Sequence, residues 1–362
     1  MNINSDENQV KFNLLVGTYT HTETCKSEGI YIFEFDAISG ELKRISNTEN
    51  VINPSYLSVS PDNKNVYAIS ENGALSTVTA FEYNSKDRTL TILNKNDTLG
   101  ADPCHLINDE QNVIVANYAG GSIAVFKKMK DLGLFEACQL IQHEGKGIDK
   151  ERQEKAHVHM VYFSPDKKYV LVNDLGLDKI FIYNYFPEAT DHILKLKNQI
   201  DLKAGSGPRH ATFSKDGKFV FVLHELDGTL TMLRYNDNGS LDLLSEINST
   251  PENFNGSASS AAIKISPDGN FLYLSHRGDL NSISVYKIHK NAELDFVERV
   301  STGGKEPRDF TIDPLGNFLL VAHEESHNIV LFERDKISGK LRNTGKMIEI
   351  CAPVNLIFTA IQ

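Results

Sequence analysis

One arrangement of apolar and polar residues recurs along the chain. Two short apolar runs, which predict β-strands, flank a polar turn of the Ser-Pro-Asp-Gly type. Clear copies span residues 57–69, 160–172, 211–222, 262–274 and 310–321, and a degenerate copy spans 106–115. Proline presets φ in such a turn, aspartate caps its own backbone, and glycine or asparagine accepts positive φ. Each copy therefore predicts a β-hairpin, and the nearly continuous apolar runs predict strands buried on both faces.

Two further strands are expected after each hairpin. The third is led in most copies by glycine or asparagine and ends in an aromatic residue, as in 121–126, 228–235, 281–286 and 328–332. A weaker fourth follows, as in 239–244. Four strands per unit are typical of a β-propeller blade. The first strands start roughly 50 residues apart, at Pro54, Pro103, Val158, Pro208, Ser260, Pro307 and Pro353.

The two ends of the chain complement each other. Residues 12–16, 29–35 and 40–44 supply a second, third and fourth strand, and residues 354–359 supply a first strand with nothing after it. Together they would complete one blade and leave the ring without a free edge. The sequence therefore predicts an all-β, seven-bladed β-propeller of four antiparallel strands per blade. We expect one domain over residues 1–362, with residues 1–11 as a flexible arm.

Composition narrows the possible partners and compartment. The formal net charge of the 362 residues is −11, which argues against a nucleic-acid surface. No apolar run is long enough to span a bilayer, and the polar start lacks a secretory signal. We expect a cytoplasmic protein, a monomer or weak homodimer, without nucleic-acid or membrane partners. Since no CxxC pair occurs, the cysteines are expected to be free thiols: Cys25, Cys104, Cys138 and Cys351.

Candidate site residues gather at one rim of the predicted ring. A hairpin returns to the end where it began, so Arg209 and Glu225, with Gly217 midway between them, should meet at the channel mouth. Polar residues are frequent at such positions in several blades. Those at the starts of first strands are His105, His157, His159, Arg209, His210, Glu306 and Arg308, and those at the ends of second strands are Asp174, His224, Glu225, Arg277, His323 and Glu324.

Several of these residues have structural alternatives. Arg209 could simply pair with Glu225, and His210, next in the strand, would point to the opposite face and pack between blades. His157 and His159 lie on one strand face and could chelate a metal. However, no HxxxH or CxxC motif occurs and arginines are near, so an anionic ligand is expected, with no metal and no other cofactor. The GxSxG, P-loop and helix-leading GxGxxG motifs are also missing.

At these residues the chain resembles the seven-bladed lactonase family, which includes propeller-type bacterial 6-phosphogluconolactonases and fungal carboxymuconate cyclases. The resemblance implies that His159, Arg209, Glu225 and Arg277 carry the chemistry. The fifth blade departs from the Pro-Arg pattern and would leave a small, neutral rim at residues 259–262. The stretches that carry the resemblance are residues 16–20, 53–57, 117–126, 157–159, 173–178, 207–210, 224–225 and 306–308.

The residue types suit the hydrolysis of a lactone. Water attack forms a tetrahedral oxyanion, so the reaction needs a base, an oxyanion donor and an acid for the ring oxygen. We expect His159 or Glu225 as the base, Arg209 at the oxyanion or a carboxylate, and Arg277 and Arg308 at a distal phosphate. The predicted activity is hydrolysis of a sugar lactone, 6-phosphogluconolactone to 6-phosphogluconate in the pentose phosphate pathway. A lactonizing cycloisomerase acting on carboxymuconates and a non-catalytic binding platform are the alternatives.

Overall fold

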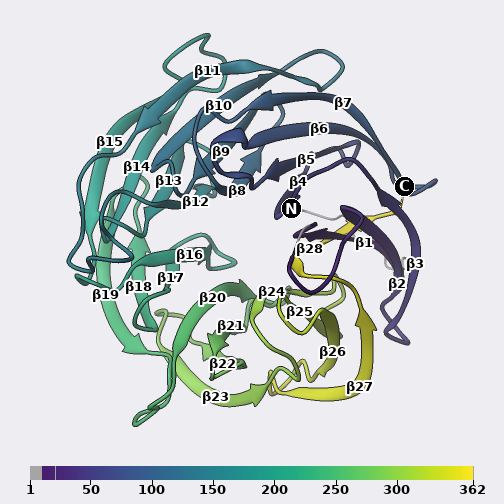
Figure 1. The fold of residues 1–362 in the computed structure, drawn as a ribbon. Coiled ribbons are helices and arrows are strands. Elements are labelled where there is room, and N and C mark those ends of the chain that lie inside the picture. The colour runs from purple at the N-terminus through teal and green to yellow at the C-terminus, as the bar shows by residue number, and fades with distance from the viewer. Residues whose placement is uncertain (1–9, 21, 362) are drawn as a thin grey trace.

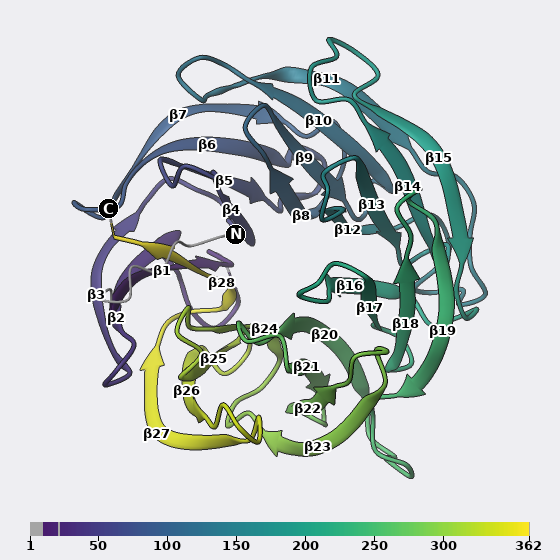
Figure 2. The same cartoon turned by 180° about the vertical axis from the view of Figure 1, so that it is seen from behind.

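The computed structural model describes residues 10–20 and 22–361. Seven four-stranded antiparallel sheets stand in a ring, each with its first strand innermost (Figure 1). The view from behind shows the same ring (Figure 2). The predicted seven-bladed propeller is therefore confirmed. Residues 1–9 of the expected arm lie outside the described residues, whereas Lys11 already belongs to a strand.

The blades follow one another along the chain. The first four are β4 (Tyr56–Val59), β5 (Asn65–Ser70), β6 (Thr77–Asn84) and β7 (Thr89–Asp97); β8 (Pro103–Asn108), β9 (Asn112–Asn117), β10 (Ser122–Lys128) and β11 (Leu134–Gln142); β12 (Val158–Phe163), β13 (Tyr169–Asp174), β14 (Lys179–Tyr185) and β15 (Leu194–Asp201); and β16 (Pro208–Phe213), β17 (Phe219–His224), β18 (Thr229–Tyr235) and β19 (Leu241–Asn248). The fifth and sixth are β20 (Ala258–Ile265), β21 (Phe271–Gly278), β22 (Ser282–Ile288) and β23 (Leu294–Ser301), and β24 (Pro307–Ile312), β25 (Phe318–His323), β26 (Asn328–Arg334) and β27 (Leu341–Glu349). The closing blade joins β28 (Pro353–Ala360) to β1 (Lys11–Thr18), β2 (Ile30–Asp36) and β3 (Glu41–Thr48), and a 3-10 helix (Gly73–Leu75) follows β5.

The turn between the first two strands is built by side chains that satisfy the backbone. In the third blade, Ser164 donates to Asp166, and the two side chains accept hydrogen bonds from the backbone of Tyr169 and Lys168. The same pair recurs as Ser214–Asp216 in the fourth blade and Ser266–Asp268 in the fifth. The aspartate cap is therefore confirmed, and the serine hydroxyl acts beside it.

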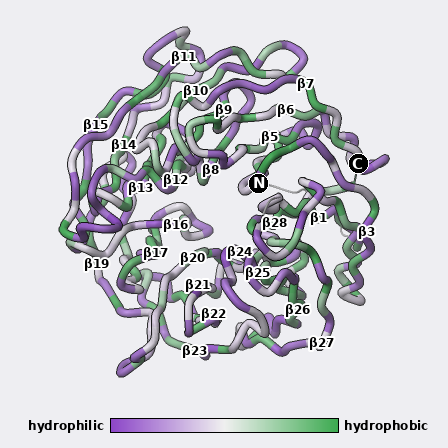
Figure 3. The backbone as a smooth tube through the Cα atoms, in the orientation of Figure 1, coloured by the Kyte–Doolittle hydropathy of each residue, from purple (hydrophilic) through white to green (hydrophobic). Residues whose placement is uncertain are grey.

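The core is divided into layers between neighbouring blades rather than gathered at one centre. One layer packs β1 and β28 against β25 and β26, with Phe12, Phe35, Phe318 and Phe358 among its members. Strand β1 is buried along its length after Lys11, as two-sided packing requires. Hydrophobic segments accordingly occur all round the ring (Figure 3). Among the described residues, no helix has the length and apolar character to cross a membrane.

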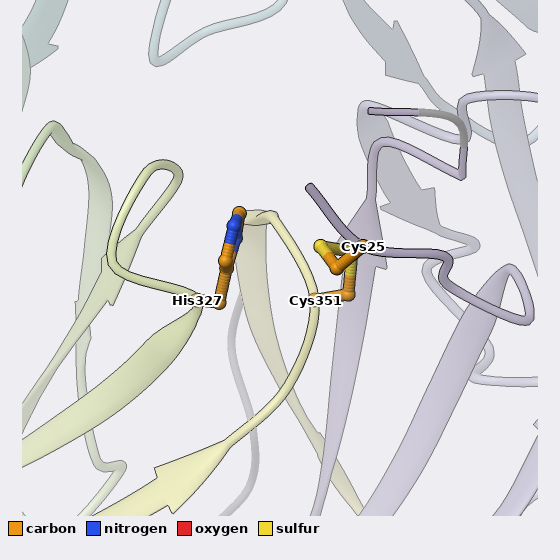
Figure 4. A group of neighbouring side chains, drawn as sticks. All are labelled: Cys25, His327 and Cys351. Carbon is orange, nitrogen blue, oxygen red and sulfur yellow. A yellow bond between two sulfur atoms is a disulfide. The ribbon is translucent and has the colours of Figure 1, made fainter. Parts of the chain in front are cut away.

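The closing blade joins the two ends of the chain as predicted. Strand β1 pairs with β28, with Phe12 opposite Ala360. A disulfide between Cys25 and Cys351 lies beside this pairing, and His327 stands close to it (Figure 4). The expectation of free thiols is therefore wrong for Cys25 and Cys351, because ring closure brings their Cα atoms within 5.9 Å across 326 residues. Cys104 and Cys138 are free thiols.

Candidate active site

A repeated irregularity of the first strands places the site residues. In six blades the pairing of the first and second strands shifts by one residue near the mouth of the ring. In four of these blades the extra residues are Cys104, His159, Arg209 and Arg308. Such a β-bulge interrupts the alternation of faces and re-aims the side chain of the extra residue. Equivalent positions of four blades are thereby directed to one region.

Three of these residues, Cys104, His159 and Arg308, line a cavity of about 460 Å³ at the channel mouth. Small residues of the fifth blade, Ser257, Ala258 and Ser259, form part of its wall, which fits the small, neutral rim expected there. The other lining residues are Glu71, Cys104, Tyr118, Arg152, His159, Glu225, Arg277, Gly278, Glu306 and Arg308. The wall is thus mostly polar and combines arginines with carboxylates.

Glu225 is the centre of the charged cluster. Its Oε2 accepts hydrogen bonds from Arg209 Nε at 2.8 Å and lies 3.2 Å from an Arg277 nitrogen. The same oxygen is 3.7 Å from His159 Nε2. Its Oε1 is 2.5 Å from an Arg152 nitrogen. The four predicted catalytic residues therefore meet around one buried carboxylate.

The electrostatics of the cluster fix its charges near neutral pH. Burial raises the pKa of Glu225, but the positive charges of Arg277 and Arg209 outweigh it, and the net pKa is lowered. Burial and the charge of Arg209 lower the pKa of His159 well below its usual value. Burial and Arg277 lower the pKa of Arg209 to about 10. The cluster thus holds an ionised Glu225, a neutral His159 and charged arginines, with more positive than negative charge around the carboxylate.

Arg308 of the sixth blade also lines the cavity. Its guanidinium lies over the ring of Tyr19 at 5.4 Å and 3.7 Å from a Glu324 oxygen. Tyr19 in turn donates a hydrogen bond of 2.8 Å to Glu71. Glu306 accepts from the Gly278 backbone at 2.7 Å. Arg308 and Glu306 line the cavity, and Glu324 supports Arg308 from behind.

His105 and His210 lie in the central channel, which corrects one expectation. The His210 ring is 5.3 Å from His159, 5.7 Å from His105 and 6.4 Å from Tyr56. These partners belong to the third, second and first blades, so His210 does not pack between two neighbouring blades. The bulge at Arg209 is the reason, because it cancels the alternation that would turn His210 away. His210 Nε2 and His105 Nδ1 are buried and have no hydrogen-bond partner among the described residues.

Four predicted ligand contacts lie away from the cavity. Asp174 bonds His143 at 2.7 Å, and His224 bonds Thr231 at 2.8 Å inside the fourth blade. His157 stacks on Tyr118, with ring centroids 4.6 Å apart, and is buried. His323 is fully buried behind the rim. These residues hold the scaffold of the rim, so their prediction as substrate contacts is not supported by their positions.

The predicted site residues leave out several residues of the wall, among them Glu71, Cys104, Tyr118 and Arg152. Glu71 and Tyr118 follow the second strands of the first two blades, as Glu225 does in the fourth. The sequence marks Tyr118 as a rim position at the end of a second strand without a role for this residue, and the same rule applied to the first blade would find Glu71. Arg152 lies in the long connection between β11 and β12, where no repeat pattern signals its place. Its discovery requires the structure.

Comparison with known proteins agrees with this architecture. Residues 13–358 match the family described as "Lactonase, 7-bladed beta-propeller". A 6-phosphogluconolactonase of Bacillus subtilis (strain 168) is 36% identical over 347 residues, which cover 95% of this chain and 97% of that protein. A periplasmic gluconolactonase structure from Pseudomonas aeruginosa is 34% identical, covers 97% of this chain and 100% of that chain, and has a TM-score of 0.91. A crystal structure from Bacteroides fragilis NCTC 9343 is 39% identical, covers 97% and 98%, and has a TM-score of 0.92. The chain belongs to the seven-bladed β-propeller lactonase family.

Proposed function

We propose that the protein hydrolyses a sugar lactone at the cavity around Glu225, with 6-phosphogluconolactone as the substrate and 6-phosphogluconate as the product. The observation that carries the proposal is the buried, ionised Glu225, which lines the cavity and lies next to a neutral His159 and the three arginines Arg152, Arg209 and Arg277. The names of the Bacillus subtilis relative and the Pseudomonas aeruginosa neighbour agree with lactone hydrolysis. A place in the pentose phosphate pathway follows from this substrate.

Glu225 is the better candidate for the base that activates water. His159 Nε2 faces Glu225 Oε2, an arrangement that suits an Nε2–H donor and leaves no lone pair on that nitrogen for water. Arg209 uses Nε on Glu225 and another nitrogen on the Ala261 carbonyl at 2.7 Å. Its role is therefore to hold Glu225 rather than to meet the oxyanion. Arg277, which lines the cavity, is placed to stabilise the oxyanion.

Arg308 is the proposed contact of the distal phosphate. It lines the same cavity as Glu225, and its separation of 3.7 Å from Glu324 is longer than a hydrogen bond. A phosphate could therefore bind Arg308 without the loss of a strong ion pair. The partner expected is thus a small anionic lactone. The sequence-based expectation of a monomer or weak homodimer stays a prediction.

The decay of freshly generated 6-phosphoglucono-δ-lactone tests this function. Wild-type protein should exceed the spontaneous rate saturably, and Glu225→Gln should return the rate close to the blank. Glu333→Gln is the matched control, because Glu333 is an outer glutamate that pairs with exposed Arg342. A wild-type rate equal to the blank would reject this substrate. Carboxymuconates would then be assayed next, since the cycloisomerase alternative uses the same residues.

The compartment can be tested through the disulfide. Disulfides persist mainly in oxidising compartments, so the Cys25–Cys351 bond weakens the cytoplasmic expectation. Cells lysed directly into an alkylating reagent should report four labelled cysteines if the protein resides in a reducing cytosol. Two labelled cysteines, Cys104 and Cys138, would indicate an oxidising location.

A further inference from the structure

We propose that Arg152 joins Arg308 in making the enzyme selective for anionic lactones: it pairs with Glu225 before substrate binds and then moves to the anionic group that Arg308 also contacts, which releases one oxygen of Glu225. This inference rests on the proposed lactonase function. It assigns to a residue of the β11–β12 connection both the recognition of substrate charge and the release of the base.

Arg152 differs from the other two arginines around Glu225 in its freedom to move. The side chain of Arg209 is 3% exposed and that of Arg277 is 11% exposed, whereas that of Arg152 is 43% exposed. Arg209 is also fixed by the Ala261 carbonyl, and Arg277 by Ser259 Oγ at 2.8 Å. Besides Glu225, Arg152 contacts Tyr118 Oη at 3.2 Å. Arg152 therefore has the most solvent-exposed side chain of the three arginines, and Glu225 keeps Arg209 and Arg277 as partners when Arg152 moves.

The backbone that carries Arg152 is nevertheless firmly held. The next residue, Gln153, is fully buried, and its amide donates to the Leu175 carbonyl at 2.8 Å. Its side-chain oxygen accepts from the Asp149 backbone at 3.1 Å. Gly176 lets the connection approach, because a Cβ there would stand 2.0 Å from the Lys155 carbonyl oxygen. Arg152 is therefore a long charged side chain on a fixed base at the cavity wall.

The two oxygens of Glu225 are not equivalent. Oε2 is held by Arg209 and Arg277, while Oε1 is the oxygen bonded by Arg152. Departure of Arg152 toward a phosphate or carboxylate would leave Oε1 able to accept a proton from water. It would also remove one of the positive charges that lower the pKa of Glu225, so the carboxylate would become a stronger base. An uncharged lactone provides no group that draws Arg152 away.

Kinetics with a charged and an uncharged substrate test the inference. Arg152→Gln should lower kcat/KM for 6-phosphoglucono-δ-lactone about 30-fold more than kcat/KM for glucono-δ-lactone, the loss expected for a charge-assisted hydrogen bond. Arg152→Lys should restore part of this preference. Lys150→Gln, which removes an exposed charge from the same connection, is the control and should match wild type. Equal losses on both substrates, or no loss on either, would overturn the inference.

Equilibrium binding separates this inference from the proposed function. Calorimetric titration of wild type should show tighter binding of 6-phosphogluconate than of gluconate, and Arg152→Gln should reduce that difference about 30-fold. If wild type hydrolyses neither lactone but keeps this Arg152-dependent preference, the proposed activity fails and the anion contact stands. A preference unchanged in Arg152→Gln would overturn the inference even if the lactonase activity is present. Thermal melting of each variant verifies that it is folded.

Discussion

Two buried arginines occupy opposite ends of the hairpins and do different work. Arg209, 2% exposed, lies at the mouth and joins Glu225 of the fourth blade to the Ala261 carbonyl of the fifth. Arg334, 5% exposed, lies at the turn end and joins Asp268 and Tyr273 of the fifth blade to the Gly316 carbonyl of the sixth. Both connect neighbouring blades. Only Arg209 shares its carboxylate partner with a histidine and two further arginines at the channel mouth.

The difference shows that the two ends of the repeated hairpin have separate roles. Turn ends repeat the Ser-x-Asp pair because every hairpin must satisfy the same backbone groups. Mouth ends vary from blade to blade because bulges release side chains from the ladder and direct them inward. Substitutions at the mouth should therefore affect catalysis, and substitutions at the turn end should affect stability.

The largest expected effect is the loss of activity in Arg209→Met. Glu225 would keep Arg152 and Arg277 as partners, but the Ala261 carbonyl would lose its donor, so the free energy of unfolding should fall by about 2 kcal/mol. The carboxylate would lose its most buried support, and kcat should fall roughly 100-fold or more, as for the loss of a precisely placed group. Lactone kinetics and urea denaturation measure the two quantities. A large loss of stability with normal kcat would erase the distinction between the two ends.

Arg334→Met should lose stability without loss of activity. It would leave the buried side of Asp268 and the Gly316 carbonyl without their charged partner. The free energy of unfolding should fall by about 3 kcal/mol, the range for a broken buried pair. At a temperature where the variant is folded, its kcat should equal that of wild type. A changed kcat would mean that a substitution at the turn end alters the arrangement of the site residues at the mouth.

A fall in pH should lower the free energy of unfolding through buried histidines at the mouth end. It should raise the free energy of unfolding through one carboxyl group, that of Asp313, at the turn end. Burial lowers the pKa of His105 and His276 to about 3, and that of His224 and His323 to about 4. Below pH 6.5 the unfolded chain binds protons that the folded histidines do not, so the free energy of unfolding should fall by about 1 kcal/mol for each at pH 5.5. Burial raises the pKa of Asp313 to about 6, so the folded protein binds a proton at Asp313 at a pH where the unfolded chain does not. This raises the free energy of unfolding as the pH falls and offsets part of the loss caused by the histidines.

Urea midpoints at pH 7.5 and 5.5 measure this balance. Wild type should be less stable at the lower pH. Asp313→Asn should lose more stability than wild type over the same interval, because the compensating protonation is removed. A variant with the same pH dependence as wild type would show that Asp313 does not titrate in this range.

The sequence revealed the repeated parts of the molecule better than the unique ones. Seven blades and the closure of the ring follow from the period of the hairpins and from the complementary ends. The clustering of Arg209 with Glu225 follows from hairpin geometry. By contrast, the orientation of His210 depends on a one-residue bulge, which the alternation of apolar and polar residues does not encode. Arg152 lies in a connection without a period, and the Cys25–Cys351 contact arises only from ring closure.

The smallest expected effect is a gain in stability at one turn. Lys167 adopts φ +54°, at the place where the fourth and fifth blades have Gly217 and Gly269. A residue with a Cβ is strained in this left-handed region, whereas glycine is not. Lys167 also pairs with Glu110 at 3.2 Å, but both side chains are at least half exposed and the pair contributes little. Lys167→Gly should therefore raise the free energy of unfolding by about 0.5 kcal/mol, less than the full αL penalty because glycine also stabilises the unfolded chain. Thermal melting should show a small rise in Tm with unchanged lactone kinetics, whereas a fall in Tm would mean that the side chain of Lys167 contributes more than its backbone strain costs.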